Sequence, residues 1–166
     1  MKTKEMIQRL SLFLLALVLT MPTWAQGGNG MEVVSIGSKE DWKRFCQRVN
    51  HNGEPFLNAK LTQDVDLGTD IAMVGTAKKP YAGTFDGQNH VLTVNWDAGS
   101  ANDVAPFRRV GGATIKNLRT EGSIRSNSFY LSGLIDEAYG GSNTVANCVS
   151  AVNITSSYNE GSSDVA

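Results

Sequence analysis

The sequence predicts an all-β protein: a right-handed parallel β-helix (β-solenoid) with a short N-terminal amphipathic capping helix. The main observation is an internal repeat, because residues 104–124 (VAPFRRVGGATIKNLRTEGSI) are echoed about thirty residues later by residues 133–154 (GLIDEAYGGSNTVANCVSAVNI). Each copy contains a short apolar element, a Gly-Gly turn and a strand-like segment, with no helix between the strands. Repeats of this kind stack as coils that bury their apolar faces against one another. Parallel crossovers are almost always right-handed.

Residues 1–25 have the pattern of a signal peptide. A basic start is followed by an apolar run over residues 10–21, and Thr23 and Ala25 place small residues at the two positions that a signal peptidase reads. The apolar run is shorter than the roughly twenty residues of a membrane span. We therefore expect export to the cell surface or the medium, with the periplasm as the alternative. We expect no transmembrane segment in the mature chain.

The charge of the mature chain argues against one class of partner. Residues 1–25 carry three basic residues and one acidic residue, so the rest has 12 Lys and Arg against 15 Asp and Glu, a net charge of −3. Nucleic acid is not expected as a partner, because phosphate binding needs a basic patch.

Residues 26–37 are expected to form a flexible leader and the first strand, and residues 38–166 the β-helix domain. Its helix is predicted at residues 38–49, where Ser38 and Asp41 form a capping pair. Apolar residues then recur with helical spacing, at Trp42, Phe45, Cys46 and Val49. The first coil of a solenoid exposes an apolar end and unpaired strand edges, so we expect the helix to cover them rather than to bind a separate partner.

Strands and turns follow from residue 56 onward. Leu92, Val94 and Trp96 alternate with polar residues, which is the period of a strand. Alignment of the two repeat copies predicts that six residues point inward and stack between coils: Ile115, Leu118, Val145, Cys148, Val152 and Ile154. Because Cys46 belongs to the helix and Cys148 to a distant coil, two buried thiols are expected rather than a disulfide.

Four segments give the chain a family resemblance: DWKRFCQRVNHNG, LTQDVDLG, YAGTFDGQNHVL and APFRRVGGATIKNL. Together they resemble the N-terminal part of secreted bacterial right-handed parallel β-helix proteins that carry the GLUG repeat. The resemblance covers nearly all of residues 36–166, and its most specific part is the turn around Asp86-Gly87. It implies an opening helix followed by stacked coils, and a structural place for His90 in that turn.

Aromatic side chains are the main candidates for ligand binding, because an exposed ring in a turn or at the edge of a coil stacks well on a sugar. The candidate residues are Tyr81, Trp96, Tyr130 and Tyr139, and we also considered Phe129 and Tyr158. The alternative is that these rings pack in the core, since they are large apolar surfaces.

The acidic residues suggest only a weak metal site. Asp64 and Asp66 lie two apart on a predicted strand and share one face, so they are candidates for Ca²⁺ ligands. The alternative is that they are solvated strand-edge residues, and the sequence lacks an EF-hand or RTX-like spacing. No catalytic motif is present, so no catalytic residue, metal or cofactor is predicted.

These observations favour an exported, non-enzymatic module for display or adhesion that contacts a surface glycan or another protein. One alternative is a fragment of a carbohydrate-active enzyme, either a polysaccharide lyase or a glycoside hydrolase. A second is an accessory segment of a large secreted peptidase. An enzyme should gather charged residues from adjacent coils at one lateral groove, whereas a display module should scatter them. The ending SSDVA resembles the start of another coil. We therefore expect a truncated domain that self-associates end to end.

Overall fold

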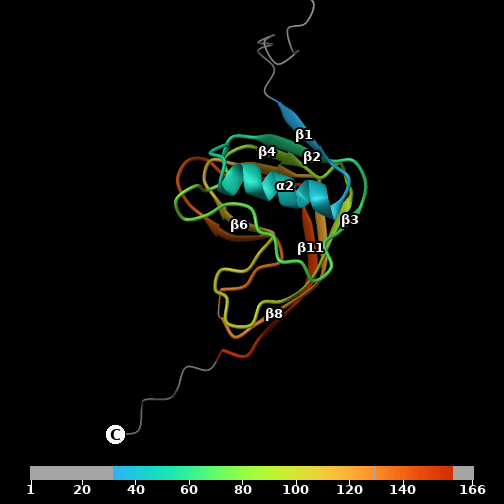
Figure 1. Ribbon diagram of the computed structural model, residues 1–166, viewed down its shortest axis with the longest axis vertical. Coiled ribbons are helices and arrows are strands. Elements are labelled where there is room, and N and C mark those ends of the chain that lie inside the picture. Colours follow the sequence, from blue (N-terminus) through green and yellow to red (C-terminus); the bar gives the residue numbers. More distant parts are fainter. Residues whose placement is uncertain (1–31, 129, 159–166) are drawn as a thin grey trace, which may run out of the picture. The chain divides into compact units, whose positions relative to one another are not determined.

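Three parallel sheets form a β-solenoid of about four turns, which confirms the predicted fold class (Figure 1). The computed structural model describes residues 32–128 and 130–158. The predicted signal peptide, the leader, Phe129 and the last residues of the chain lie outside this part. Among the described residues, no helix has both the length and the apolar character needed to cross a membrane.

The strands follow one another around the solenoid in a fixed order. Sheet A contains β1 (Val33–Ile36), β2 (Asn58–Leu61), β4 (Thr84–Asp86), β7 (Thr114–Lys116) and β10 (Thr144–Ala146). Sheet B contains β3 (Val65–Asp66), β5 (Val91–Asp97), β8 (Arg119–Ser126) and β11 (Val149–Ser156). Sheet C contains β6 (Phe107–Val110) and β9 (Ile135–Ala138). Apart from β1, which pairs with β2 across the helix, each strand therefore pairs with its counterpart in the next coil rather than with its neighbour in the sequence.

The register of the repeat is the one that the sequence alignment predicted. Thr114 pairs with Thr144 in sheet A, and Phe107 pairs with Ile135 in sheet C. The turn that follows sheet A stacks in the same way. Asn117 and Asn147 both adopt a φ of 52°, and the Asn147 Nδ2 atom donates a hydrogen bond to Asn117 Oδ1 at 2.9 Å. Asparagine suits this position because it tolerates the left-handed conformation and its side chain bonds to its copy.

The core is a stack of inward-facing side chains. Along β5, Leu92, Val94 and Trp96 are buried and alternate with more exposed residues, as the period of two predicted. At the end nearest the helix, aromatic rings fill the interior, with Phe85 and Phe107 meeting edge to face at 5.0 Å between ring centroids. Such pairs add stabilisation beyond the area that they bury.

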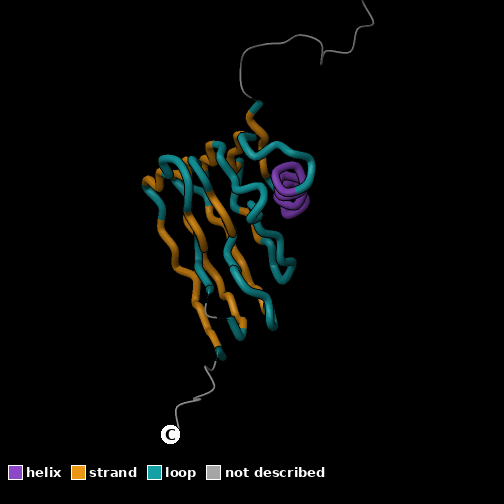
Figure 2. The backbone as a smooth tube through the Cα atoms, turned by 90° about the vertical axis from the view of Figure 1, so that its left-hand side faces the viewer, coloured by secondary structure: helices purple, strands orange, loops and turns teal. Residues whose placement is uncertain are grey.

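Helix α2 (Lys39–Asn50) lies at one end of the stack of coils (Figure 2). Ser38 is its N-cap, because the Ser38 Oγ atom accepts a hydrogen bond from the Asp41 N–H, as predicted. The Trp42 ring is buried, and its Nε1 atom donates to the Ala72 carbonyl at 2.8 Å.

The Asn50 side chain takes the place of a missing strand beside residues 73–75. Its Nδ2 atom donates to the Met73 carbonyl and its Oδ1 atom accepts from the Gly75 N–H, each at 2.8 Å. An amide that bonds in both directions satisfies an otherwise unpaired sheet edge in the way that a neighbouring peptide would. The helix therefore covers the first coil, as expected.

The last coil departs from the prediction that all six stacking residues are buried. Ile115 and Leu118 are buried, but Val145 is 53% exposed and Ile154 is 46% exposed. Both keep the predicted register, Val145 with Ile115 and Ile154 with Ile124. They are exposed because no described strand pairs with the outer edge of β10 or β11. Cys148 and Val152 are partly buried against the core.

Candidate functional site

The outer side of sheet C carries the charged residues that could bind a ligand. In β6, Phe107 and Val110 are buried, whereas Arg108 and Arg109 between them are not. The N–H groups of both arginines donate to the same carbonyl, that of Val74, at 2.8 and 3.3 Å. Two residues opposite one acceptor define a β-bulge, which interrupts the alternation of faces. Both arginine side chains therefore escape the core.

The next coil repeats this arrangement with opposite charge. Arg109 pairs with Glu137 in the strand register, and Asp136 occupies the place equivalent to Arg108. The Arg109 guanidinium forms ion pairs with Glu137 and, at 2.6 Å, with Asp103. Its side chain is only 17% exposed, so these ion pairs hold it firmly in one position.

A cavity of about 470 Å³ opens over this cluster, and we call it the acidic cavity. Its lining residues are Asp103, Arg109, Tyr130, Asp136 and Glu137. The volume lies within the range of small-molecule sites. Tyr130 is exposed, so its ring is accessible to a ligand at the cavity.

Asp136 is the acid of the cavity with no cation bound to it. In the part of the chain that the structure describes, its carboxylate makes no hydrogen bond or ion pair. Burial raises the pKa of Asp136, and the nearby Asp103 raises it further, while Arg109 and Arg108 oppose the shift. A proton or a hydrogen-bond donor from a ligand would therefore be favourable at this carboxylate.

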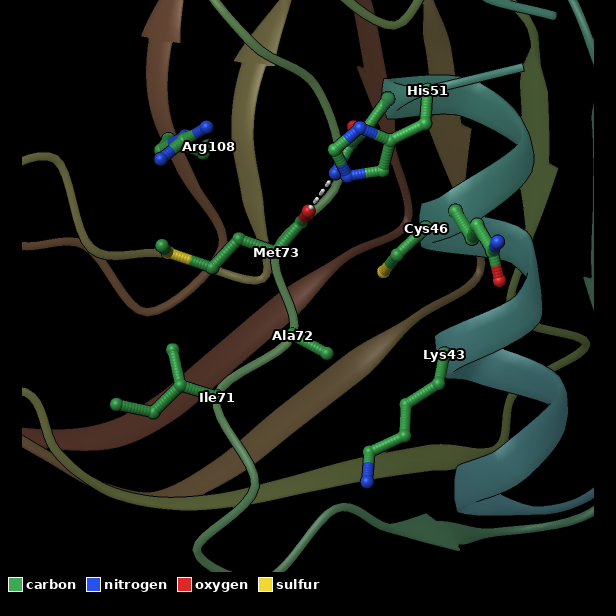
Figure 3. A pocket seen from close by; sticks show the side chains of 9 residues that line it. Lys43, Cys46, His51, Ile71, Ala72, Met73 and Arg108 are labelled. Carbon is green, nitrogen blue, oxygen red and sulfur yellow. Dashed lines mark hydrogen bonds between the residues drawn. The ribbon is translucent and has the colours of Figure 1, made fainter.

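A second cavity, of about 480 Å³, lies between α2 and residues 71–73, and we call it the helix-side cavity (Figure 3). Figure 3 shows Lys43 and Cys46 on α2 facing this segment, with Arg108 on the far side. Lys43 forms an ion pair with Asp70 at 2.7 Å, and the Asn50 amide donates a hydrogen bond to the Met73 carbonyl. Two polar side chains of the helix-side cavity therefore already have partners within the protein.

The two cysteines are free thiols, Cys46 in α2 and Cys148 in the turn between β10 and β11. Burial raises the pKa of the Cys46 thiol, which lies in the wall of the helix-side cavity, to about 12. It stays protonated near neutral pH and is not a nucleophile there.

Two of the four predicted aromatic binding residues are core residues, which corrects the prediction. Tyr81 is fully buried, its ring packs against Phe45, and its hydroxyl donates to the Leu57 carbonyl at 2.9 Å. Trp96 is also buried, with Ile124 beside it in the next strand. Its indole Nε1 has no hydrogen-bond partner among the described residues. Neither ring is accessible to a sugar.

The other two candidates, Tyr130 and Tyr139, are exposed, but only one of them lines a cavity. Tyr130 lines the acidic cavity, as described above. Tyr139 is partly exposed, and its hydroxyl donates to the Ala77 carbonyl at 3.1 Å. It does not line either cavity. Only Tyr130 therefore joins a cluster of charged side chains.

Asp64 and Asp66 bind local backbone groups. Asp64 accepts from the Val91 N–H at 2.9 Å and contacts the His90 ring at 3.1 Å, and these two contacts lower the pKa of its carboxyl. Asp66 accepts from the Gly68 N–H at 2.8 Å. Within residues 32–128 and 130–158, no three acidic, histidine or cysteine side chains group together as metal ligands.

Sequence reasoning missed Asp103, Arg109, Asp136 and Glu137. A signal for three of them was present. Because Phe107 aligns with Ile135 in the repeat, the Arg-Arg and Asp-Glu pairs that follow must lie beside each other in adjacent coils. Asp103 has no such signal, since it comes from the turn before β6.

No family model, curated protein or solved structure matches this chain. The fold and the site define a parallel β-helix that carries a preformed, charged cavity on one lateral face.

Proposed function

We propose that this protein is an exported, non-enzymatic β-helix module that binds a saccharide in the acidic cavity. The observation that carries the proposal is an exposed aromatic ring, Tyr130, beside charged side chains that three segments hold in one cavity. Sugar rings stack their C–H faces on aromatic rings, and their hydroxyl groups donate to carboxylates. The ion pairs of Arg109 preorganise the site, so little ordering would be lost on binding.

The charge of the cavity indicates which saccharides it accepts. Three carboxylates, those of Asp103, Asp136 and Glu137, face one guanidinium, that of Arg109. Among the described residues, Arg109 forms its ion pairs with two of these acids, Asp103 and Glu137, so the guanidinium is not available to an anion. A uronate or a sulfated sugar would meet repulsion. Neutral sugars and amino sugars are therefore the expected ligands, and a polysaccharide lyase, which acts on acidic sugars, is disfavoured.

A glycoside hydrolase is the second candidate, because charged residues of adjacent coils do gather at one lateral face. Such an enzyme needs one protonated carboxyl and one ionised carboxylate at the scissile bond. The raised pKa of Asp136 suits the acid. The partner would have to be Asp103 or Glu137, and the ion pair of each with Arg109 makes its carboxylate a weaker base and nucleophile. Binding without hydrolysis is favoured for this reason.

Export and display at a cell surface are part of the proposal and rest on the pattern of residues 1–25. The GLUG-type family and a bacterial origin rest on the sequence segments that carry the resemblance. The interpretation as an accessory segment of a secreted peptidase has the same support, and no residue cluster described above adds to it.

Glycan-array binding of the purified protein, followed by titration of the best ligand, tests the proposal. We expect neutral or amino-sugar glycans to bind and uronates not to bind. Tyr130→Ala should weaken binding by about tenfold, the effect of losing one stacked ring. Tyr158→Ala is the matched control, because Tyr158 is exposed but lies outside the cavity.

Two results would contradict the proposal: no binding to any glycan, or equal affinity of Tyr130→Ala and the unaltered protein. Release of reducing ends from the bound glycan, abolished in Asp136→Asn, would instead establish the hydrolase.

A further inference from the structure

The helix-side cavity differs from the acidic cavity in the sign of its charge. Its lining includes Lys43 on α2, His51 just after that helix and Arg108 in β6. Among the described residues that line it, none is acidic. A cavity whose charged groups are all basic attracts anions, whereas the acidic cavity repels them.

Arg108 is the cation of the helix-side cavity that lacks an anionic partner. It is half-buried, and among the described residues it forms no ion pair. Its Nε atom donates a hydrogen bond to the Gly75 carbonyl at 3.3 Å, which orients the guanidinium and leaves both Nη groups for a ligand. A partly desolvated guanidinium with spare donors binds a carboxylate through two parallel hydrogen bonds.

The charges around the cavity favour an anion with a single negative charge. Lys39 and Lys43 both form ion pairs with Asp70, at 3.1 and 2.7 Å, so these three groups keep one positive charge between them. Arg108 adds a second positive charge, which the nearby Asp136 offsets in part without an ion pair. A monoanion therefore matches the cavity better than a dianion such as a phosphate monoester.

The wall of the cavity beside Arg108 is apolar. Ile71 is 42% exposed, and Met73 is partly buried against the core. Figure 3 shows both side chains on the same side of their segment as Arg108, whereas Ala72 points toward α2. An exposed isoleucine and a methionine next to a cation favour a ligand that carries an apolar group beside its charge. A hydrophilic anion, such as a uronate, would leave this apolar surface uncovered.

The carbonyl groups beside the cavity, which would otherwise repel an anion, already accept hydrogen bonds. Those of Ala72 and Met73 accept from side chains of α2, each at 2.8 Å. That of Gln47, near the end of α2, accepts from two N–H groups that follow the helix. The Nη groups of Arg108 and the spare N–H groups of Lys43 are therefore the polar groups most available to a ligand.

We propose that the helix-side cavity binds a small organic carboxylate with an apolar body, such as a medium-chain carboxylic acid. Arg108 holds the carboxylate through its Nη groups, and Ile71 and Met73 contact the apolar carbon atoms. Lys43 adds positive potential from the other side of the cavity. The volume of about 480 Å³ lies within the range of small-molecule sites. No described residue lines both cavities, so this site is independent of the saccharide site proposed above.

Titration of the isotope-labelled protein with octanoate, followed by the chemical shifts of its backbone amides, tests the site. We expect the signals of residues 71–73 and 108 to shift, with a dissociation constant of about 1 mM or below. Butyrate, which is four methylene groups shorter, should bind at least about tenfold more weakly, because each buried methylene contributes up to about fourfold. Octylammonium has the same apolar chain and the opposite charge, so it should not shift these signals.

Substitutions show whether Arg108 holds the carboxylate. Arg108→Gln should weaken octanoate binding at least about tenfold, and Arg108→Lys should weaken it less, because lysine keeps the charge but loses the paired hydrogen bonds. Arg125→Gln is the matched control, since Arg125 is exposed on β8 and lies outside the cavity. Tyr130→Ala, in the acidic cavity, should leave octanoate affinity unchanged. Circular dichroism shows whether the variants remain folded.

Four results would overturn the proposal. They are no saturable shift at millimolar octanoate, equal binding of octanoate and octylammonium, equal affinity of Arg108→Gln and the unaltered protein, and weaker octanoate binding by Tyr130→Ala. The comparison of octanoate with butyrate and octylammonium uses the unaltered protein, so it decides the question even if Arg108→Gln does not fold.

Discussion

Replacing isoleucine by alanine at two paired positions tests the coil stacking and the exposure of the last described coil together. Ile124 in β8 and Ile154 in β11 are direct partners in the strand register, and both face inward. Ile124 is 1% exposed and Ile154 is 46% exposed. Isoleucine is therefore replaced by alanine twice in the same column of stacked side chains, once between two coils, at Ile124, and once in the last described coil, at Ile154.

The two costs should differ by about 2 kcal/mol or more. Truncation of isoleucine to alanine removes about three carbon atoms, worth about 2.4 kcal/mol of transfer free energy when fully buried, at about 0.8 kcal/mol each. The cavity left at Ile124 adds to this, so we expect a loss of about 3–4 kcal/mol. At Ile154 only about half of the transfer free energy is lost and no closed cavity forms, so we expect about 1 kcal/mol.

Urea denaturation followed by circular dichroism measures both free energies of unfolding, at a protein concentration low enough to keep the chain monomeric. In thermal unfolding the difference corresponds to about 8 °C, since each kcal/mol shifts the midpoint by about 4 °C for a domain of this size. Equal losses for Ile124→Ala and Ile154→Ala would refute the exposed position of Ile154 in the last described coil. A loss under 1 kcal/mol at Ile124 would refute the stacking register itself.

Three further substitutions test other parts of the structure. Asn50→Ala should lower the free energy of unfolding, measured by urea denaturation, by about 2–3 kcal/mol, because it leaves the Met73 carbonyl and the Gly75 N–H unpaired. Gln47→Ala, on the exposed face of α2, is the control and should cost under about 0.5 kcal/mol in the same assay. Tyr81→Phe should cost about 1–2 kcal/mol in the same assay and leave glycan affinity unchanged, since its hydroxyl serves only a buried hydrogen bond. A raised pKa means that ionised Asp136 costs folding free energy. Asp136→Asn should therefore raise the melting temperature at neutral pH, and this gain should vanish below about pH 4, where the aspartate is protonated in both states.

The fold was predictable because its signals are local and repeated. The capping pair and the helical spacing at residues 38–49 need no knowledge of distant contacts. The repeat fixes which residues meet, since stacked coils bring equivalent positions together, and the pairing of Thr114 with Thr144 follows directly. The exposure of Val145 could not be read from the repeat, because a pattern of inward-facing residues does not show whether a further strand covers them.

Two of the four aromatic candidates, Tyr81 and Trp96, were wrong because two signals conflicted. Trp96 ends the alternation Leu92, Val94, Trp96, which predicts an inward position, yet its large ring near a turn also suggested sugar binding. The strand period was the better guide. For Tyr81 the surrounding turn residues suggested exposure, but the chain folds so that its ring packs against Phe45 and Phe107 in the core.

The charged cluster shows how a solenoid creates a site from residues that are unremarkable one by one. Neighbouring parallel strands lie about 4.8 Å apart, so equivalent side chains in successive coils are forced into contact. A bulge in β6 turns two consecutive residues outward, and the register of β6 with β9 sets Arg109 beside Glu137, with Arg108 and Asp136 next to them in the two strands. Had the four residues carried one sign, repulsion would oppose the stacking. Opposite charges stabilise it, and Asp136, which forms no ion pair among the described residues, is the acid that we propose for contact with a ligand.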